Sequence, residues 1–196
     1  MIKELTLTGI VACLATTFAV GAQASGKTGK APYAGQQGRA IKSLSAEDIA
    51  ALEAGRGWGF AKPAELNGYP GPLHVLELGQ ELDLTAGQRR SVQAVFDEMK
   101  AAAQKAGQVF LTAERALDAA FAKGVATPDA IADLTLASAK ARAEVQRVHL
   151  QAHLQTTPLL TKMQRHQYVT LRGYAGGRHG GHDGRGSKGK GSHSGH

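Results

Sequence analysis

The chain has 196 residues, enough for one folded domain with a modest core. Aromatic residues make up only 5% of the composition and alanine is abundant, which favours packed helices over a sheet protein. The formal net charge of +7 lies in the two ends, because residues 43–171 contain 13 basic and 14 acidic side chains. This distribution argues against a nucleic-acid-reading surface on the folded part, so no specific nucleic-acid partner is expected.

Residues 1–24 have the pattern of a secretion signal. Lys3 supplies the positive start, a nearly uncharged apolar run covers residues 5–20, and residues 22–24 have the small-x-small form that signal peptidase cuts. The run is short for a span of about 20 apolar residues, so cleavage after Ala24 is preferred to a membrane anchor. We therefore expect a periplasmic protein with no transmembrane segment after cleavage.

Two other features of this region are not expected to act in the mature chain. Cys13, the single cysteine, lies inside the apolar run, so cleavage after Ala24 excludes disulfide and thiol chemistry; lipidation of Cys13 stays an alternative. Residues 21–28 match the phosphate-binding loop pattern, but a Gly/Pro/Gln-rich stretch follows where that loop needs a helix. Nucleotide binding is therefore not expected.

The next part of the chain is predicted to contain short elements. Ser45 can cap a helix, and Pro72 is well placed as the first residue of another. Between them, the rings of Trp58 and Phe60 are expected to dock on the helical core. The predicted elements are a disordered basic linker 25–42, a short helix 45–55, a flexible connector 55–60, a turn 67–72 and a helix from 72 to about 82.

Two long helices come next. From Thr85 to about Lys123, apolar residues recur at steps of three and four without a proline, the pattern of one amphipathic helix. Thr127 and Pro128 begin a second helix that extends to about Gln155. Because the connection is short, the two are expected to form an antiparallel hairpin.

The predicted fold class is therefore all-α, a long antiparallel helical hairpin with short flanking helices. A last helix from Lys162 to Arg172 completes a helical domain over residues 43–174. Residues 175–196 are rich in glycine, histidine and basic residues, and we expect a disordered tail there.

Two helix starts share one motif, Leu-Thr-x-x-Gln followed by arginine. In each copy the threonine hydroxyl is expected to accept from the N3 amide while the glutamine reaches back to the amide of the cap residue. The leucine before the cap can pin the helix entry against the core. The residues concerned are Leu84, Thr85 and Gln88 in the first copy, and Leu160, Thr161 and Gln164 in the second.

The motif pair, its placement and the secretion signal resemble the Spy/CpxP group of periplasmic proteins, which includes ZraP-like zinc-responsive and CnrX-like metal-sensing branches. The resemblance covers roughly residues 72–174. It implies a small helical protein, usually a homodimer, that acts in envelope stress. The implied activities are an ATP-independent chaperone for unfolded or misfolded envelope proteins, an inhibitor of a sensor kinase, or a metal-responsive regulator.

Histidines provide the basis for a metal-binding function. His149 and His153 are four residues apart, so they share one helix face and could both bind a metal, with His74 or His166 completing the set. The structural alternative is that these side chains edge the helix interface. The tail adds candidates for weak, adaptable binding of Zn, Cu or Ni: His179, His182, His193 and His196.

No catalytic constellation accompanies these residues. The sequence contains no nucleophile–base pair, no zincin spacing and no paired carboxylates with a pocket around them, so no enzyme is expected. The predicted function is a chaperone-like binder of unfolded proteins that requires no cofactor. The alternative is a periplasmic heavy-metal sensor or buffer.

Overall fold

The computed structural model describes residues 31–175, and residues from Gly35 onward belong to one compact unit. The predicted secretion signal, its cleavage site and Cys13 lie outside the described residues, as do the four tail histidines. Within the described part the unit is all-helical and contains no strand, as predicted. None of the helices in residues 31–175 has the length and apolar character needed to cross a membrane.

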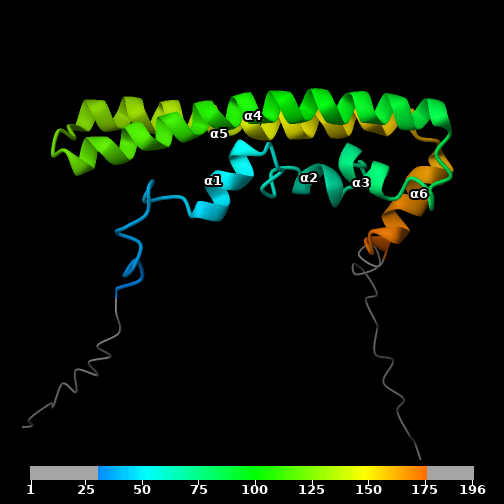
Figure 1. The fold of residues 1–196 in the computed structure, drawn as a ribbon, viewed down its shortest axis with the longest axis horizontal. Helices are drawn as coiled ribbons and strands as arrows, with labels where there is room; N and C mark the ends of the chain where they lie inside the picture. The colour runs from blue at the N-terminus through cyan, green and yellow to red at the C-terminus, as the bar shows by residue number, and fades with distance from the viewer. Residues whose placement is uncertain (1–30, 176–196) are drawn as a thin grey trace, which may run out of the picture. The chain divides into compact units, whose positions relative to one another are not determined.

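The two longest helices form the predicted antiparallel hairpin. Helix α4 covers Ala86–Ala122 and helix α5 covers Pro128–Thr156, and they pack against each other along their length (Figure 1). At 1.5 Å per residue, the 37 residues of α4 extend about 55 Å. Thr127 caps α5, with its hydroxyl accepting from the amide of Ala130, and Pro128 occupies the first turn.

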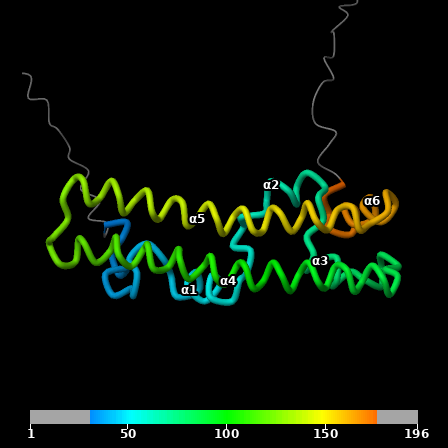
Figure 2. Tube along the Cα trace, turned by 90° about the horizontal axis from the view of Figure 1, so that it is seen from above, coloured from blue at the N-terminus to red at the C-terminus, as the bar shows by residue number. Residues whose placement is uncertain are grey.

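The short elements cover one side of this hairpin. Figure 2 shows the hairpin from above: α1 lies along α4, α2 lies beside α5, and α3 lies close to both long helices. A 3-10 turn, Thr157–Leu159, leads from α5 into α6. The elements are α1 (Ala46–Glu53), α2 (Lys62–Glu65), α3 (Pro72–Glu77) and α6 (Lys162–Leu171).

Two predicted boundaries need correction. The helix that begins at Pro72 ends at Glu77 instead of near Leu82, because the chain turns at residues 78–84 to bury Leu82. The connector after α1 contains the additional short helix α2, whose proline lies in its first turn. The connector rings do pack on the core, since Phe60 is buried and the Trp58 ring lies 6.2 Å from that of Phe110.

The expectation of a disordered linker is wrong for its last residues. Ile41 is fully buried and belongs to the core cluster around Phe110. The neighbouring Lys42 forms an ion pair with Asp118 of α4 at 3.5 Å. Leu44, three residues after Ile41, is also buried. This segment therefore adds two apolar side chains to the core although its composition is basic.

Gly107, inside α4, permits the close approach of α1. A Cβ at this position would lie 2.6 Å from the carbonyl oxygen of Leu52, closer than real Cβ atoms come to such an atom. Leu52 is itself buried in the core cluster. The glycine that weakens α4 by about 1 kcal/mol therefore lets the two helix backbones meet.

Both Leu-Thr-x-x-Gln motifs form capping boxes, and the two boxes contact each other. The hydroxyls of Thr85 and Thr161 each accept from the amide three residues on. Gln88 and Gln164 return to the amides of their cap residues and also bond to each other. Leu160 is buried in a second core cluster, which thus lies where the two motifs meet.

Candidate functional site

A cavity of about 520 Å³ opens between the hairpin and the segment that runs from the end of α1 to the start of α3. Its volume lies within the range of about 300–1,000 Å³ that is usual for small-molecule sites. Residues of α4 and α5 form one wall, and the connector and α3 form the other. The residues that line the cavity include Arg56, Gly57, Trp58, Lys62, Glu65, Gly71, Leu73, His74, Phe96, Met99, Lys100, His149 and His153.

The two histidines on α5 are buried side by side at this cavity. His149 is 3% exposed and His153 is 6% exposed. Each ring lies against a glycine: a Cβ on Gly57 would be 3.9 Å from His149 Nδ1, and a Cβ on Gly71 would be only 2.8 Å from His153 Cε1. The predicted shared face is therefore the face of α5 that the short elements cover.

His153 has a defined tautomer. Its Nδ1 lies 2.7 Å from the carbonyl oxygen of Tyr69, which can only accept, so Nδ1 carries a hydrogen. Glu65 Oε2 lies 3.8 Å from the same nitrogen. His153 thus ties the turn after α2 to the hairpin.

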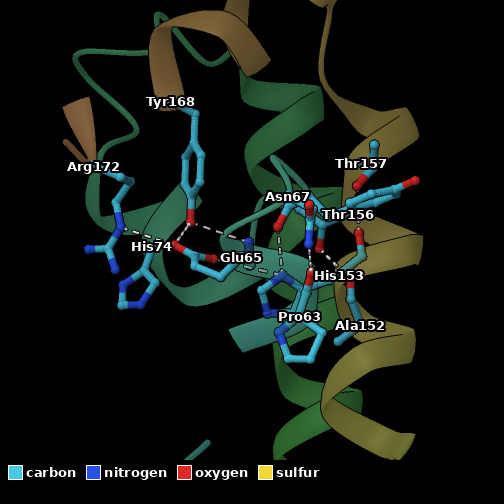
Figure 3. A network of polar contacts seen from close by, with 12 residues as sticks. Pro63, Glu65, Asn67, His74, Ala152, His153, Thr156, Thr157, Tyr168 and Arg172 are labelled. Atoms are coloured by element: carbon cyan, nitrogen blue, oxygen red, sulfur yellow. Dashed lines mark hydrogen bonds and ion pairs between the residues drawn. The ribbon is translucent and has the colours of Figure 1, made fainter. Parts of the chain in front are cut away.

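Glu65 is the centre of a buried polar cluster, shown in Figure 3 between Tyr168 and Arg172 on one side and His153 on the other. Its Oε1 accepts from the Tyr168 hydroxyl at 2.7 Å and from Arg172 Nε at 3.1 Å. The Tyr168 oxygen in turn accepts from the amide of Gly71 at 3.4 Å. These contacts connect α2, α3 and α6.

Two side chains of this region, Tyr168 and His149, have shifted pKa values. Burial and the hydrogen bond to Glu65 raise the pKa of the Tyr168 hydroxyl far above its ordinary value of 10.0. Burial and the neighbouring His153 lower the pKa of His149 below 6.5, so His149 is neutral at pH 7. A neutral ring suits these surroundings, because His149 Nε2 is buried and has no hydrogen-bond partner within the described part of the chain. The same is true of Glu65 Oε2.

The predicted metal ligands are only partly brought together. His74 lines the same cavity as His149 and His153, but its Nδ1 is 2.9 Å from Glu77 on its own helix. His166 is exposed on α6 and does not line the cavity. In residues 31–175, no group of three or more histidine, cysteine or acidic side chains is arranged to hold a metal ion.

Three residues of this site were not singled out in the sequence: Glu65, Tyr168 and Arg172. Glu65 carried a signal, since it is the only acidic residue between Glu53 and Glu77 and follows a proline at the start of a short helix. Its partners lie more than 100 residues away in the chain, so no local pattern identifies them.

No family model, curated protein or solved structure matches this chain. The resemblance to the Spy/CpxP group therefore depends on the two Leu-Thr-x-x-Gln motifs and the predicted secretion signal.

Proposed function

We propose that this protein is a periplasmic, ATP-independent chaperone that holds unfolded envelope proteins on exposed apolar side chains. The observation that supports this function is the number and placement of large apolar residues left in solvent. Between Gly35 and residue 175, ten such side chains are more than 40% exposed: Leu66, Tyr69, Leu73, Val109, Phe121, Val125, Leu136, Leu154, Met163 and Leu171.

One group of these side chains lies at the turn of the hairpin. Phe121 and Val125 are each 62% exposed, at the end of α4 and in the loop that follows. The loop is fixed by hydrogen bonds from the amides of Gly124 and Val125 to the end of α4. A large aromatic and a branched side chain are thus presented by an ordered turn.

A second group lies where α2 meets α5. Leu66 is 60% exposed at the end of α2, and Leu154 is 58% exposed on α5. Tyr69 is 41% exposed, and its carbonyl accepts from His153, the neighbour of Leu154. The hydrogen bond from His153 therefore fixes Tyr69 against α5.

Separated apolar groups suit an extended client better than a compact partner. Full burial of a Leu, Val or Phe side chain contributes about 1.5–3 kcal/mol, so each group alone binds weakly. An unfolded chain can contact both groups with successive apolar segments and leave again. No nucleotide or other cofactor is needed for such binding.

Light scattering from a chemically denatured client, diluted in the presence of chelator, tests this proposal. The purified chain should suppress aggregation near one-to-one stoichiometry. Phe121→Ser with Val125→Ser, or Leu66→Ser with Leu154→Ser, should each weaken suppression at least twofold, because each removes one apolar group. The exposed polar pair Lys105→Ser with Gln108→Ser is the matched control and should act like the parent chain. Unchanged suppression in both apolar variants would rule out these surfaces.

Metal binding is the second candidate function, supported by three histidines at one cavity. Calorimetric titration with Zn, Cu and Ni tests it directly. Loss of micromolar binding in His149→Ala with His153→Ala would assign the metal to the cavity. If binding disappears only when residues 175–196 are deleted, the tail carries it instead.

A further inference from the structure

We propose that the cavity between the hairpin and residues 54–74 binds a small amphipathic anion, a carboxylate with an apolar body. This ligand site is separate from the two apolar groups of the proposed chaperone function, which contain Phe121 and Val125, and Leu66, Tyr69 and Leu154. Three properties of the cavity favour such a ligand: its apolar wall, an interior in which the described residues leave no unbalanced charge, and a cationic rim.

The wall of the cavity offers apolar surface. Trp58 lies in the connector, and Phe96 and Met99 lie on α4; all three line the cavity and are only half-buried. Leu73 of α3 is 43% exposed and lines the same space. An alkyl chain or aromatic ring that enters the cavity removes this surface from water, which favours binding.

The interior offers no free charge. Among residues 31–175, Glu65 is the only acidic residue that lines the cavity, and its carboxylate accepts hydrogen bonds from Arg172 and Tyr168. The guanidinium of Arg172 balances the charge of this carboxylate, because the two groups form an ion pair at 3.1 Å. His149 and His153 form the α5 side of the wall. The apolar body of a ligand can therefore lie inside without an opposing charge.

The rim of the cavity is cationic. Arg56, Lys62 and Lys100 line it, all three are exposed, and none forms an ion pair with another residue of the described part. Exposed lysines are ordinary on a protein surface. Here, however, the helical span is near neutral, and three cations surround one opening that carries no free acid. This arrangement complements a negatively charged head group.

Trp58 gives a direct measurement, because it is the only tryptophan of the chain and lines the cavity. We would titrate the purified chain with decanoate and with decyltrimethylammonium, each below its micelle concentration, and follow tryptophan fluorescence. Decanoate should give a saturable, one-site change and bind at least tenfold more tightly than the cation. Equal affinity for both, or no saturable change with decanoate, would overturn the proposal.

Matched triple variants test the rim. Arg56→Gln, Lys62→Gln and Lys100→Gln together should weaken decanoate binding about tenfold, as expected for the loss of several exposed charge contacts. Lys105→Gln, Lys123→Gln and Lys140→Gln together remove the same charge from exposed positions away from the cavity and should leave affinity unchanged. Equal weakening by both triple variants would show attraction to the whole protein and contradict a rim site.

A blocking variant tests the cavity itself. Gly57 has an ordinary backbone conformation, and an added Cβ would only reach van der Waals contact with His149, so Gly57→Phe places a ring in the cavity without backbone strain. Decanoate binding should be lost while the helical circular-dichroism spectrum is kept. Should this variant fail to fold, the rim variants decide alone. If a denatured client, but not decanoate, shifts Trp58 fluorescence, the occupant is a client segment and the proposal is wrong.

Discussion

Gln88 and Gln164 exchange two hydrogen bonds, at 2.8 and 3.1 Å, although 76 residues separate them in the chain. Each amide nitrogen also donates to a backbone carbonyl near the other helix start: Gln88 to Leu159 and Gln164 to Leu82. Each glutamine oxygen accepts from its own cap residue as well. The two motifs are thus both helix caps and the two halves of one tertiary contact.

Replacing either glutamine with alanine should destabilise the fold by about 2–3 kcal/mol, because several hydrogen bonds are lost and the partner amide is left partly unsatisfied. The double variant should lose at least about 1 kcal/mol less than the two single losses added together, since both remove the same contact. Urea unfolding followed by circular dichroism measures this. Gln93→Ala, which removes an exposed bond to Asp97, is the control and should change stability by less than about 0.5 kcal/mol.

Capping could be predicted from sequence because it is local, whereas the pairing could not. A threonine and a glutamine three residues apart determine the box within a single turn of helix. That the boxes meet depends on α5 and the 3-10 turn after it, which bring Gln164 back to the start of α4. This is a property of the whole hairpin, and no short pattern contains it.

Two glycines of α4 should respond in opposite ways to alanine. Gly107→Ala should destabilise the fold by about 1–2 kcal/mol, because the added Cβ would lie 2.6 Å from the carbonyl oxygen of Leu52 and overpacking exceeds the gain in helix propensity. Gly87→Ala should stabilise it by about 0.4–1 kcal/mol, since the nearest atom, Thr85 Oγ1, is 3.9 Å away. Thermal melts of both variants measure the two signs. Stabilisation by Gly107→Ala would mean that α1 does not approach α4 this closely.

Tyr168→Phe should destabilise the fold by about 1.5–3 kcal/mol at neutral pH, because Glu65 loses a hydrogen-bond donor in a buried place. The variant should also flatten the alkaline response. The pKa of Tyr168 is raised in the folded state, so on raising the pH the unfolded chain releases this proton first, near pH 10. The contribution of protonated Tyr168 to the free energy of unfolding is complete below pH 10. Above pH 10 this contribution falls by about 1.4 kcal/mol per pH unit.

Urea midpoints of the parent and Tyr168→Phe chains between pH 8 and 11 measure this difference. All other residues are identical in the two chains, so their contributions cancel in the comparison. Parallel pH profiles would show that the Tyr168 hydroxyl is not held protonated by the fold.

His149 should make the fold less stable in mild acid. Its pKa is lowered in the folded state, so as pH falls the unfolded chain binds the proton first, near pH 6.5. The contribution of neutral His149 to the free energy of unfolding is complete above pH 6.5. Below pH 6.5 this contribution falls by up to about 1.4 kcal/mol per pH unit. His149→Leu should remove this pH dependence without lowering the stability of the fold at pH 7.5. The substitution breaks no hydrogen bond of Nε2, because this atom has no partner among residues 31–175.

Unfolding at pH 7.5 and 5.5 tests this, with His166→Leu as the control because His166 is exposed. The control should keep the acid response of the parent chain. An unchanged response in His149→Leu would assign the acid sensitivity to another group.

The candidate site shows where sequence reasoning stops. The shared face of His149 and His153 follows from helix geometry and could be predicted. That this face is covered, instead of edging the interface, depends on Gly57 and Gly71, which let the connector and α3 approach the two rings. From the sequence alone, glycines in a connector predict a flexible segment. In the structure, Gly57 and Gly71 instead allow the backbone to pack closely against the two histidine rings.

The position of Glu65 in the chain has a consequence for the order of synthesis. Both of its hydrogen-bond donors come from the last helix and its cap, 103 and 107 residues later. The layer formed by α1, α2 and α3 likewise has no hairpin to pack on until α4 and α5 exist. A chain that emerges N-terminus first therefore keeps Glu65 without these two donors until Tyr168 and Arg172 have been synthesised. The contacts of α2 with α6 therefore form only after every other helix of residues 35–175 has been made.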